Sequence, residues 1–476
     1  MALPHRPPDW VRESAYEIDW AGLDVVVCGI GVSGTAAAEV LLRRGARVRV
    51  VDAGATDAAT LRASALTALG AEVLLGDGDP DVGTPHLAVT SPGWSPDQPL
   101  LRRLAAAGVP VWGEVELAWR FSRPGTAWLA VTGTNGKTTT VEILAAMLAA
   151  VPLRAEAAGN IGTPLLEAVL RDVPPDWLAV ELSSFQLHWS ESIRPRVAAI
   201  LNVAPDHLDW HGSLAAYAAD KVRVWARMGE GDVAVGNADD PLVVALLAAA
   251  PAGRKVEFTL APPDEGQLGV DAGRLVDRAF GNGDLVAVAE LTGLTGSHNV
   301  ANALAALAVA LGAGVPVEPC LSALSSFAPG EHRLATVLEH AGVRYVDDSK
   351  ATNPHAAVQA LAAFDRVVWI AGGLNKGLEF DDLVAGARDR LVAAVLIGSC
   401  AHQLRDALAR HAPEVPVHRA DSMQTAVEVA AALAQPGDTV LLAPAAASMD
   451  MFRDYRDRGD AFAAAVAAVT GRTEKQ

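Results

Sequence analysis

A glycine-rich loop with a lysine and adjacent threonines is the stretch of this 476-residue chain best suited to chemistry. It reads Gly133-Thr134-Asn135-Gly136-Lys137-Thr138-Thr139, between an apolar run of strand type at 128–131 and a helical pattern at 141–148. Loop N–H groups and a helix N-terminus in this order point at an anion and cradle phosphates. Lys137 can then reach the β- and γ-phosphates of a nucleotide, and Thr138 can bind Mg²⁺. Val131 stands where the full motif has glycine, so this is a shortened form.

A second glycine-rich turn follows the first predicted strand, at 24–28. With the helix at 35–44 and the acidic residue after the next strand, roughly 20 residues on, it matches the dinucleotide fingerprint. Another turn follows the strand at 86–90, and ligands of open α/β sheets bind at such carboxyl ends. On sequence alone, this turn is equally compatible with ligand binding and with a plain connection between two elements. The residues that this pattern brings together are Gly29, Gly31, Val32, Ser33, Asp52, Ser91, Pro92 and Gly93.

Acidic and histidine side chains follow two further predicted strands. Glu181 lies near the end of the strand at 177–182, where a carboxylate beside a phosphate loop can hold Mg²⁺; a solvated strand-end glutamate is the alternative. The strand at 198–203 is followed by Asp206, His207, Asp209 and His211, which could bind a divalent cation. Lys221 follows in a helical pattern, which by itself predicts a lysine on a helix surface.

The C-terminal third offers cationic and hydroxyl groups on strand-end loops. Lys350, Lys376 and Ser448 each follow a predicted strand. Groups of this kind on one face of a sheet suit a small dicarboxylate.

The order of these patterns predicts an α/β protein of three domains, which the length also favours. We expect a Rossmann-like N-terminal domain over 1–121, with a nucleotide-type site. A central ATP-binding P-loop domain with a mainly parallel sheet would follow over 122–328, running by βα alternation to about Phe327. A Rossmann-like C-terminal domain would cover 329–476 and carry the groups that suit a small dicarboxylate.

Composition excludes several classes of protein. The net charge of −18 argues against a nucleic-acid scaffold, which carries a basic surface. Cys28, Cys320 and Cys400 lack C-x-x-C spacing and fit free thiols in a reducing cytosol. The first 20 residues contain no apolar segment of signal-peptide type, and no apolar run is long enough to span a bilayer. The sequence therefore predicts a cytoplasmic protein without membrane insertion.

Several stretches together resemble the Mur ligase family over nearly the whole chain after its leader. They are GTNGKTT at 133–139, GNIG at 159–162, ELSSFQL at 181–187, LNVAPDHLD at 201–209, GSHNVANALAA from 296, EHR at 331–333, DDSKATN at 347–353 and SMDMF from 448. ELSSFQL and DSKATN are specific to the member that adds D-glutamate to UDP-N-acetylmuramoyl-L-alanine. The resemblance implies an ATP-dependent amide ligase with an acyl-phosphate intermediate, two Mg²⁺ ions, small-molecule substrates and a monomeric state.

The resemblance also implies a role for each matching residue. The catalytic residues would be Lys137, Asn160, His207 and Lys221. ATP would be bound by Gly133, Thr134, Asn135, Gly136, Lys137, Thr138, Thr139, Asn299, Arg333 and Asp348. The UDP substrate would be bound by the N-terminal turns named above together with Asn160 and Ser183. D-Glutamate would be bound by Lys350, Thr352, Lys376, Ser448 and Tyr455. The metal ligands would be Thr138, Glu181, His207 and a carbamylated Lys221, which replaces the surface reading of that lysine.

Other interpretations remain open at this point. A nicotinamide-dependent oxidoreductase would use the turn at 29–34 and Asp52, but it leaves Lys137, Glu181 and His207 without a role. A non-catalytic nucleotide switch would leave the C-terminal lysines and Ser448 without one. L-Glutamate is an alternative to D-glutamate, because both enantiomers present the same groups.

Overall fold

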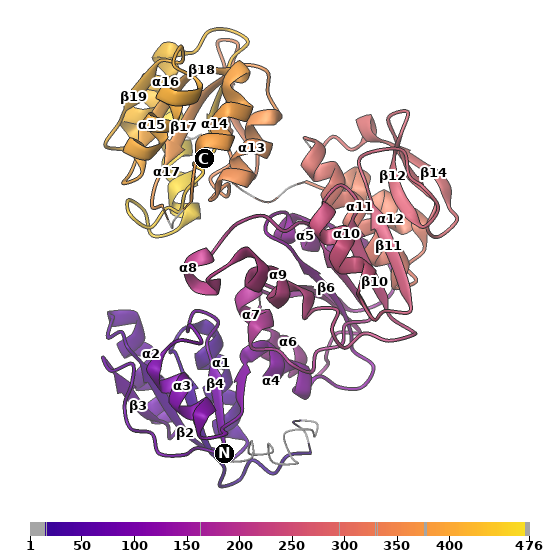
Figure 1. Cartoon of the computed structure of the whole chain (residues 1–476), viewed down its shortest axis with the longest axis vertical. Helices are drawn as coiled ribbons and strands as arrows, with labels where there is room; N and C mark the ends of the chain where they lie inside the picture. Colours follow the sequence, from indigo (N-terminus) through magenta and orange to yellow (C-terminus); the bar gives the residue numbers. More distant parts are fainter. Residues whose placement is uncertain are drawn as a thin grey trace.

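The computed structural model describes residues 15, 17–161, 163–294, 296–328, 330, 332–375 and 378–471. These residues form three β-sheets, each flanked by helices, in three successive parts of the chain (Figure 1). The mixed α/β, three-domain architecture predicted from the sequence is thus confirmed.

The N-terminal sheet is parallel throughout and has the strand order β3-β2-β1-β4-β5. The order reverses between β1 and β4, and Rossmann-type sheets bind ligands at the carboxyl ends of the strands at such a point. Its strands are β1 (Asp24–Cys28), β2 (Arg47–Asp52), β3 (Glu72–Leu75), β4 (Leu87–Thr90) and β5 (Val111–Gly113). Its helices are α1 (Val32–Arg43), α2 (Asp57–Ala68), α3 (Pro99–Ala106) and α4 (Glu114–Phe121).

The central sheet has nine strands in the order β14-β13-β12-β11-β10-β9-β6-β8-β7. Its strands are β6 (Ala127–Thr132), β7 (Ala155–Gly159), β8 (Trp177–Glu181), β9 (Val197–Ile200), β10 (Val233–Asn237), β11 (Arg254–Phe258), β12 (Gln267–Asp271), β13 (Arg274–Asp277) and β14 (Gly283–Ala287). Its helices are α5 (Lys137–Ala149), α6 (Leu165–Val169), α7 (Ser184–His188), α8 (Leu208–His211), α9 (Leu214–Val222), α10 (Pro241–Ala248), α11 (Ser297–Gly312) and α12 (Val317–Ser326), with a 3₁₀ turn at Val288–Glu290.

The expectation that βα alternation continues to about Phe327 is wrong for 254–287. Four strands follow one another there without an intervening α-helix, and β12, β13 and β14 pair antiparallel. The chain reverses between β12 and β13 at Ala272 and Gly273, with φ angles of 45° and 75°. Two left-handed residues make the tight turn that suits an antiparallel hairpin.

The C-terminal sheet has the order β15-β16-β20-β17-β18-β19 and is parallel except for the β15–β16 pair. Its strands are β15 (Ala335–His340), β16 (Val343–Asp347), β17 (Val367–Gly372), β18 (Leu391–Ile397), β19 (Val417–Arg419) and β20 (Thr439–Leu442). Its helices are α13 (Pro354–Ala362), α14 (Asp381–Ala387), α15 (Ala401–His411), α16 (Met423–Leu433) and α17 (Tyr455–Thr470), with a 3₁₀ turn at Arg388–Arg390.

Helix α4 joins the N-terminal domain to the central domain through two buried glutamates. Glu114 accepts a hydrogen bond from the backbone N–H of Leu166 at 2.8 Å. Glu116 accepts bonds from the N–H groups of Glu191 and Ser192, at 2.8 and 2.9 Å. One hydrophobic cluster also runs from the first sheet into the central one. The two domains therefore share a core.

The buried Glu114 should make the stability of this junction depend on pH. Burial raises the pKa of Glu114 to about 7, although the N–H of Leu166 opposes the shift. Between about pH 4.5 and 7 the folded chain then binds more protons at this group than the unfolded chain, so stability falls as pH rises. Over this window we expect the unfolding midpoint of wild type to fall more steeply than that of Glu114→Gln. Thermal unfolding at a series of pH values measures this, and parallel curves would contradict it.

Candidate active site

The phosphate loop connects β6 to α5 and is shaped by a glycine that no other residue could replace without strain. Gly136 has φ 83°, in the left-handed region, and immediately precedes α5. A Cβ atom built there would lie 2.3 Å from Oδ1 of Asn302 on α11. The loop also bonds to the end of β9, because Asn202 Oδ1 accepts from the N–H of Asn135 at 2.8 Å. The loop is thus fixed from two sides.

Lys137, the first residue of α5, folds back over this loop. Its Nζ donates hydrogen bonds to the carbonyls of Gly133 at 2.9 Å and Thr134 at 2.8 Å. Burial lowers the pKa of Lys137, against the opposing effect of the carboxylates of Glu181 and Asp206. The ammonium therefore lies at the mouth of the loop, where phosphate oxygens could replace the two carbonyls as acceptors.

Lys221 is buried, so the surface position indicated by its sequence pattern alone is wrong. Only 1% of the residue is exposed, and its Nζ donates to the Gly133 carbonyl at 2.8 Å. The same Nζ lies 4.3 Å from the ring centre of Tyr217, one turn earlier on α9. Burial holds the pKa of Lys221 well below its usual value, and the nearby charge of Lys137 adds to the effect. Both lysines thus contact the phosphate loop.

Glu181 ends β8 with one carboxylate oxygen bonded and the other without a partner. Asn160 donates from Nδ2 to Glu181 Oε1 at 2.7 Å. Oε2 is buried and has no hydrogen-bond partner among the described residues. Such an acceptor is costly unless a cation or donor completes it. Thr138, on the first turn of α5, is also largely buried.

This donor set fits Mg²⁺ bound together with a nucleotide. The described part of the chain holds no group of three His, Cys, Asp or Glu side chains placed to bind a metal by themselves. Mg²⁺ commonly takes one or two protein oxygens and completes its shell with water and substrate phosphates. The Glu181 carboxylate and the Thr138 hydroxyl are of that type.

His207 immediately precedes α8 and has a left-handed φ of 53°. Its N–H donates to Asp206 Oδ1 at 2.9 Å, and its ring packs edge-on against Phe185 with 4.7 Å between ring centres. The conformation is strained for a residue with a side chain, and such strain is typical of functional positions.

Asp220, next to Lys221, accepts hydrogen bonds that the sequence did not reveal. His188 and His211 donate to it from Nδ1 at 3.0 Å, and Arg223 Nε lies 3.1 Å away. Burial opposes its ionisation, but the bonds from His188 and His211 lower the pKa of Asp220 to about 2.

The C-terminal domain contacts the phosphate loop directly. Arg333 donates from Nη1 to Thr139 Oγ1 at 2.8 Å. Asn353 donates from Nδ2 to Asn135 Oδ1 at 3.0 Å, and Nδ1 of His355 lies 2.9 Å from the Asn135 amide nitrogen. Neither Asn353 nor His355 was assigned from the sequence, where Asn353 matches the pattern of a helix cap and does cap α13.

Two further residues predicted to bind ATP are Asn299 in the central domain and Asp348 in the C-terminal domain. Asn299 is buried on α11, and its Oδ1 accepts from Asn302 Nδ2 at 3.3 Å. Asp348 accepts from the N–H of Leu334 at 3.2 Å. Burial raises the pKa of Asp348 to about 7.

Four of the five residues predicted to bind glutamate lie in described parts of the C-terminal domain. Lys350 Nζ lies 3.9 Å from the ring centre of Tyr455, and Ser448 is buried. Thr352 follows in the same loop as Lys350, and its N–H donates to the Lys350 carbonyl at 2.8 Å. Lys376 lies outside the described residues, as does Gly162 of the GNIG stretch.

Arg458 holds two of these loops together and was missed by the sequence. It is fully buried on α17. Its guanidinium donates to Oγ and O of Ser349, at 3.0 and 2.8 Å, and to the carbonyl of Ala446 at 3.0 Å. Burial lowers the pKa of Arg458 to about 10. An arginine near the start of an alanine-rich helix gives no sequence signal of such a role.

The N-terminal turns meet at the carboxyl ends of β1, β2 and β4. Both oxygens of Asp52 accept backbone bonds at 2.8 Å, from Ile30 and Gly54. Ser91 Oγ donates to the Gly29 carbonyl at 3.3 Å. A Cβ at Gly34 would lie 1.8 Å from that carbonyl oxygen, so the close approach of α1 needs glycine. Val32 is exposed on the turn, and Ser183 caps α7 beside Glu181.

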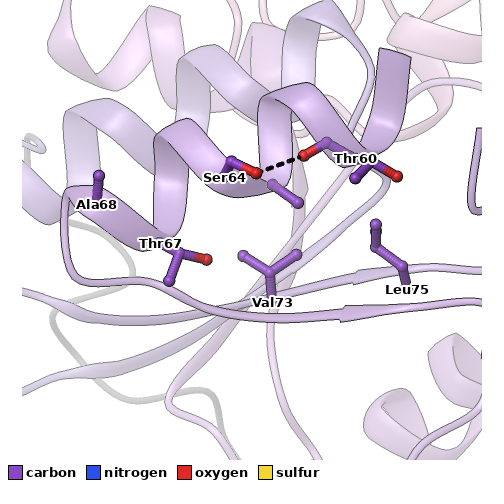
Figure 2. A pocket seen from close by; sticks show the side chains of 7 residues that line it. Thr60, Ser64, Thr67, Ala68, Val73 and Leu75 are labelled. Atoms are coloured by element: carbon purple, nitrogen blue, oxygen red, sulfur yellow. Dashed lines mark hydrogen bonds between the residues drawn. The ribbon is translucent and has the colours of Figure 1, made fainter. Parts of the chain in front are cut away.

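A surface hollow of the N-terminal domain contains none of the predicted site residues. It lies between α2 and the edge strand β3, lined by Thr60, Ala63, Ser64, Thr67, Ala68, Val73 and Leu75 (Figure 2). This hollow is therefore not part of the candidate active site.

Family models match all three domains. The model of the Mur ligase middle domain matches residues 131–310, and that of the Mur ligase glutamate ligase domain matches 332–446. A model of FAD-dependent oxidoreductases matches 24–196, which includes the dinucleotide-type turn at 29–34. Among the described residues, no helix is long and apolar enough to cross a membrane.

Several relatives are similar over almost the whole chain. The UDP-N-acetylmuramoylalanine–D-glutamate ligase of Frankia casuarinae is 62% identical over 95% of this chain and 96% of its own length. The enzyme of the same name from Streptomyces coelicolor is 52% identical, with coverages of 94% and 98%.

Solved structures share the fold at low sequence identity. UDP-N-acetylmuramate–alanine ligase MurC of Thermotoga maritima has a TM-score of 0.57 and 20% identity, covering 94% of this chain and 99% of its own. MurF ligase of the same organism, solved in complex with ADP, has a TM-score of 0.57 and 17% identity, with coverages of 98% and 99%.

Proposed function

This chain belongs to the Mur ligase family, and we propose that it joins D-glutamate to UDP-N-acetylmuramoyl-L-alanine with conversion of ATP to ADP and phosphate. The observation that carries the proposal is the set of charged groups at the phosphate loop. Lys137 lies over the loop, Glu181 keeps an unpaired oxygen beside it, and Arg333 reaches it from the C-terminal domain. An oxidoreductase would need none of these groups.

The reaction proceeds in two steps. A carboxylate oxygen of the UDP substrate attacks the γ-phosphorus of ATP, giving an acyl phosphate and ADP. The glutamate amine then attacks the acyl carbon, the amide forms, and inorganic phosphate leaves with the former carboxylate oxygen. Lys137 would neutralise charge on the transferring phosphoryl group. The bonds from Arg333 and Asn353 of the C-terminal domain to the loop support an amino-acid site near the same group.

Mg²⁺ supplies charge neutralisation and orientation of the phosphate oxygens. We assign Thr138 and Glu181 to one ion, and His207 and a carbamate on Lys221 to a second. The low pKa of Lys221 supports the carbamate, because the neutral amine is the form that adds CO₂. Asn160 orients Glu181 through its 2.7 Å bond.

The remaining assignments follow the domains. The turns around Gly29, Asp52 and Ser91, with Ser183, bind the UDP substrate, and Lys350, Thr352, Lys376, Ser448 and Tyr455 bind glutamate. The predicted boundaries, 1–121, 122–328 and 329–476, form part of this proposal. Because all three domains contribute to one site, we propose that the chain works as a monomer. Its three cysteines are unpaired and buried, which supports a place in the cytoplasm.

Product analysis tests the reaction. The purified chain is incubated with ATP, Mg²⁺, UDP-N-acetylmuramoyl-L-alanine and either D- or L-glutamate, and the products are identified by mass spectrometry. We expect a product heavier by one glutamyl residue with D-glutamate alone. Product with L-glutamate alone would support the enantiomer alternative, and no product with either would overturn the proposal.

The glutamate assignment predicts a selective effect of Lys376→Ala. The lysine follows Asn375 in the glycine-rich stretch after the strand β17, a position that suits a carboxylate ligand. Loss of a charged contact to a carboxylate should raise the KM for D-glutamate by roughly tenfold or more and leave the KM for ATP nearly unchanged. Steady-state kinetics measure both, with the exposed Lys255→Ala as a control. An equal rise in both KM values would contradict the role.

A further inference from the structure

Three side chains behind the proposed metal centre form a continuous hydrogen-bonded chain. Ser184 Oγ lies 3.0 Å from His211 Nε2, and His211 Nδ1 lies 3.0 Å from Asp220 Oδ2. An ionised carboxylate can only accept, so Nδ1 of His211 carries the proton and donates to Asp220. Nε2 then accepts from the Ser184 hydroxyl. The order is that of the serine hydrolase triad.

Burial rules out that chemistry for this triad. Ser184 is 2% exposed, and the side chain of His211 has no exposed surface. The imidazole stacks on Phe185, with 5.4 Å between ring centres, and meets Tyr217 edge-on at 5.1 Å. A substrate carbonyl cannot approach a nucleophile enclosed in this way, so the triad must serve the structure around it.

Each member of the triad lies on a segment that carries one of the proposed metal-site residues. Ser184 is three residues after Glu181, at the start of α7. His211 is four residues after His207, at the other end of α8. Asp220 directly precedes Lys221 on α9.

We propose that His211 is a positioning residue that links these three segments and so holds Glu181, His207 and Lys221 in place for Mg²⁺. The inference rests on the proposed function, because that function assigns the three residues to the metal.

The local structure explains why such a link is needed. Helix α8 has only the four residues Leu208–His211, and left-handed residues flank it, His207 with φ 53° before it and Gly212 with φ 76° after it. A single helical turn has too few hydrogen bonds to hold itself. Imidazole has two ring nitrogens on opposite sides and can bond to both neighbouring segments at once, whereas a methyl group could bond to neither. Outer hydrogen-bond partners of this kind orient metal ligands.

Two serines of the same segment provide a matched test. Ser184 and Ser190 are both 2% exposed. The Ser184 hydroxyl bonds to His211, whereas the Ser190 hydroxyl donates to the Gln186 carbonyl at 2.8 Å. We would prepare Ser184→Ala, Ser190→Ala and His211→Phe, the last of which keeps an aromatic ring but loses both hydrogen bonds. ADP binding is measured by calorimetry with saturating Mg²⁺ and with EDTA, alongside the unfolding midpoint without ligand.

We expect Ser184→Ala to weaken ADP binding by roughly tenfold with Mg²⁺ and to leave it unchanged in EDTA. His211→Phe should show a larger loss of the same kind. A further variant, His211→Asn, can still donate to Asp220 and should lose less affinity than His211→Phe. Ser190→Ala should match wild type. Equal losses with and without Mg²⁺, or equal effects of the two serine variants, would overturn the proposal. Because binding is the readout, these results stand apart from whether the wild type forms product.

Discussion

Lys137→Ala should reduce ligation by on the order of a thousandfold, as expected when a preorganised charge on the transferring group is lost. The lysine ammonium lies over the phosphate loop, 2.9 and 2.8 Å from its carbonyls, and no other described lysine than Lys221 donates to that loop. Apart from Asn160 and Ser183, the residues assigned to the UDP substrate lie on the N-terminal turns, which belong to a different sheet. Its affinity should therefore stay near that of wild type.

Calorimetric titration with the UDP substrate and a ligation assay measure the two quantities on the same preparation. Lys255→Ala, on the exposed side of β11, controls for the loss of a lysine as such. A large loss of UDP-substrate affinity in Lys137→Ala would mean that the two sites are not separate. Unchanged ligation would contradict the phosphate-loop assignment.

Lys221→Ala should lose most of its activity and recover part of it when acetate or formate is added. A buried ammonium next to Lys137 would repel Mg²⁺, whereas a carbamate would offer oxygen ligands. A small carboxylate can occupy the space left by the side chain and supply the same kind of oxygen. Lys221→Arg should not be rescued, because its guanidinium stays charged and fills that space.

Ligation rates of both variants, with and without added carboxylate, measure the effect, and depletion of bicarbonate should slow wild type alone. Full activity of Lys221→Ala without any additive would end the carbamate proposal. Loss of activity without rescue would also contradict it, since the 2.8 Å bond to Gly133 would then be the role of the lysine.

The sequence predicted the elements that carry strong local patterns. The strand, glycine turn and helix at both nucleotide-type sites lie where expected, because buried β-branched runs and glycines with left-handed φ are constrained locally. The antiparallel strands β12–β14 were missed. Their turn at Ala272–Gly273 places a non-glycine residue at φ 45°, which local propensity does not favour.

Burial of polar residues was the harder part of the site to predict. Lys221 matches a surface lysine in pattern, and only the fold shows that α9 turns it toward Gly133. Arg458 acquires its role from Ser349, which is far away in the chain. Asp220 acquires its role from His188, which lies on another helix. Such pairings depend on tertiary packing, and a single sequence carries no local trace of them.

Release of inorganic phosphate, measured with each substrate omitted in turn, tests the central claim most directly. With ATP, Mg²⁺ and UDP-N-acetylmuramoyl-L-alanine present, the account predicts rapid phosphate release only after D-glutamate is added, one phosphate per amide formed. Omission of the UDP substrate should abolish it. Phosphate release that is independent of D-glutamate, or that continues without the UDP substrate, would contradict the account and favour a nucleotide-hydrolysing switch.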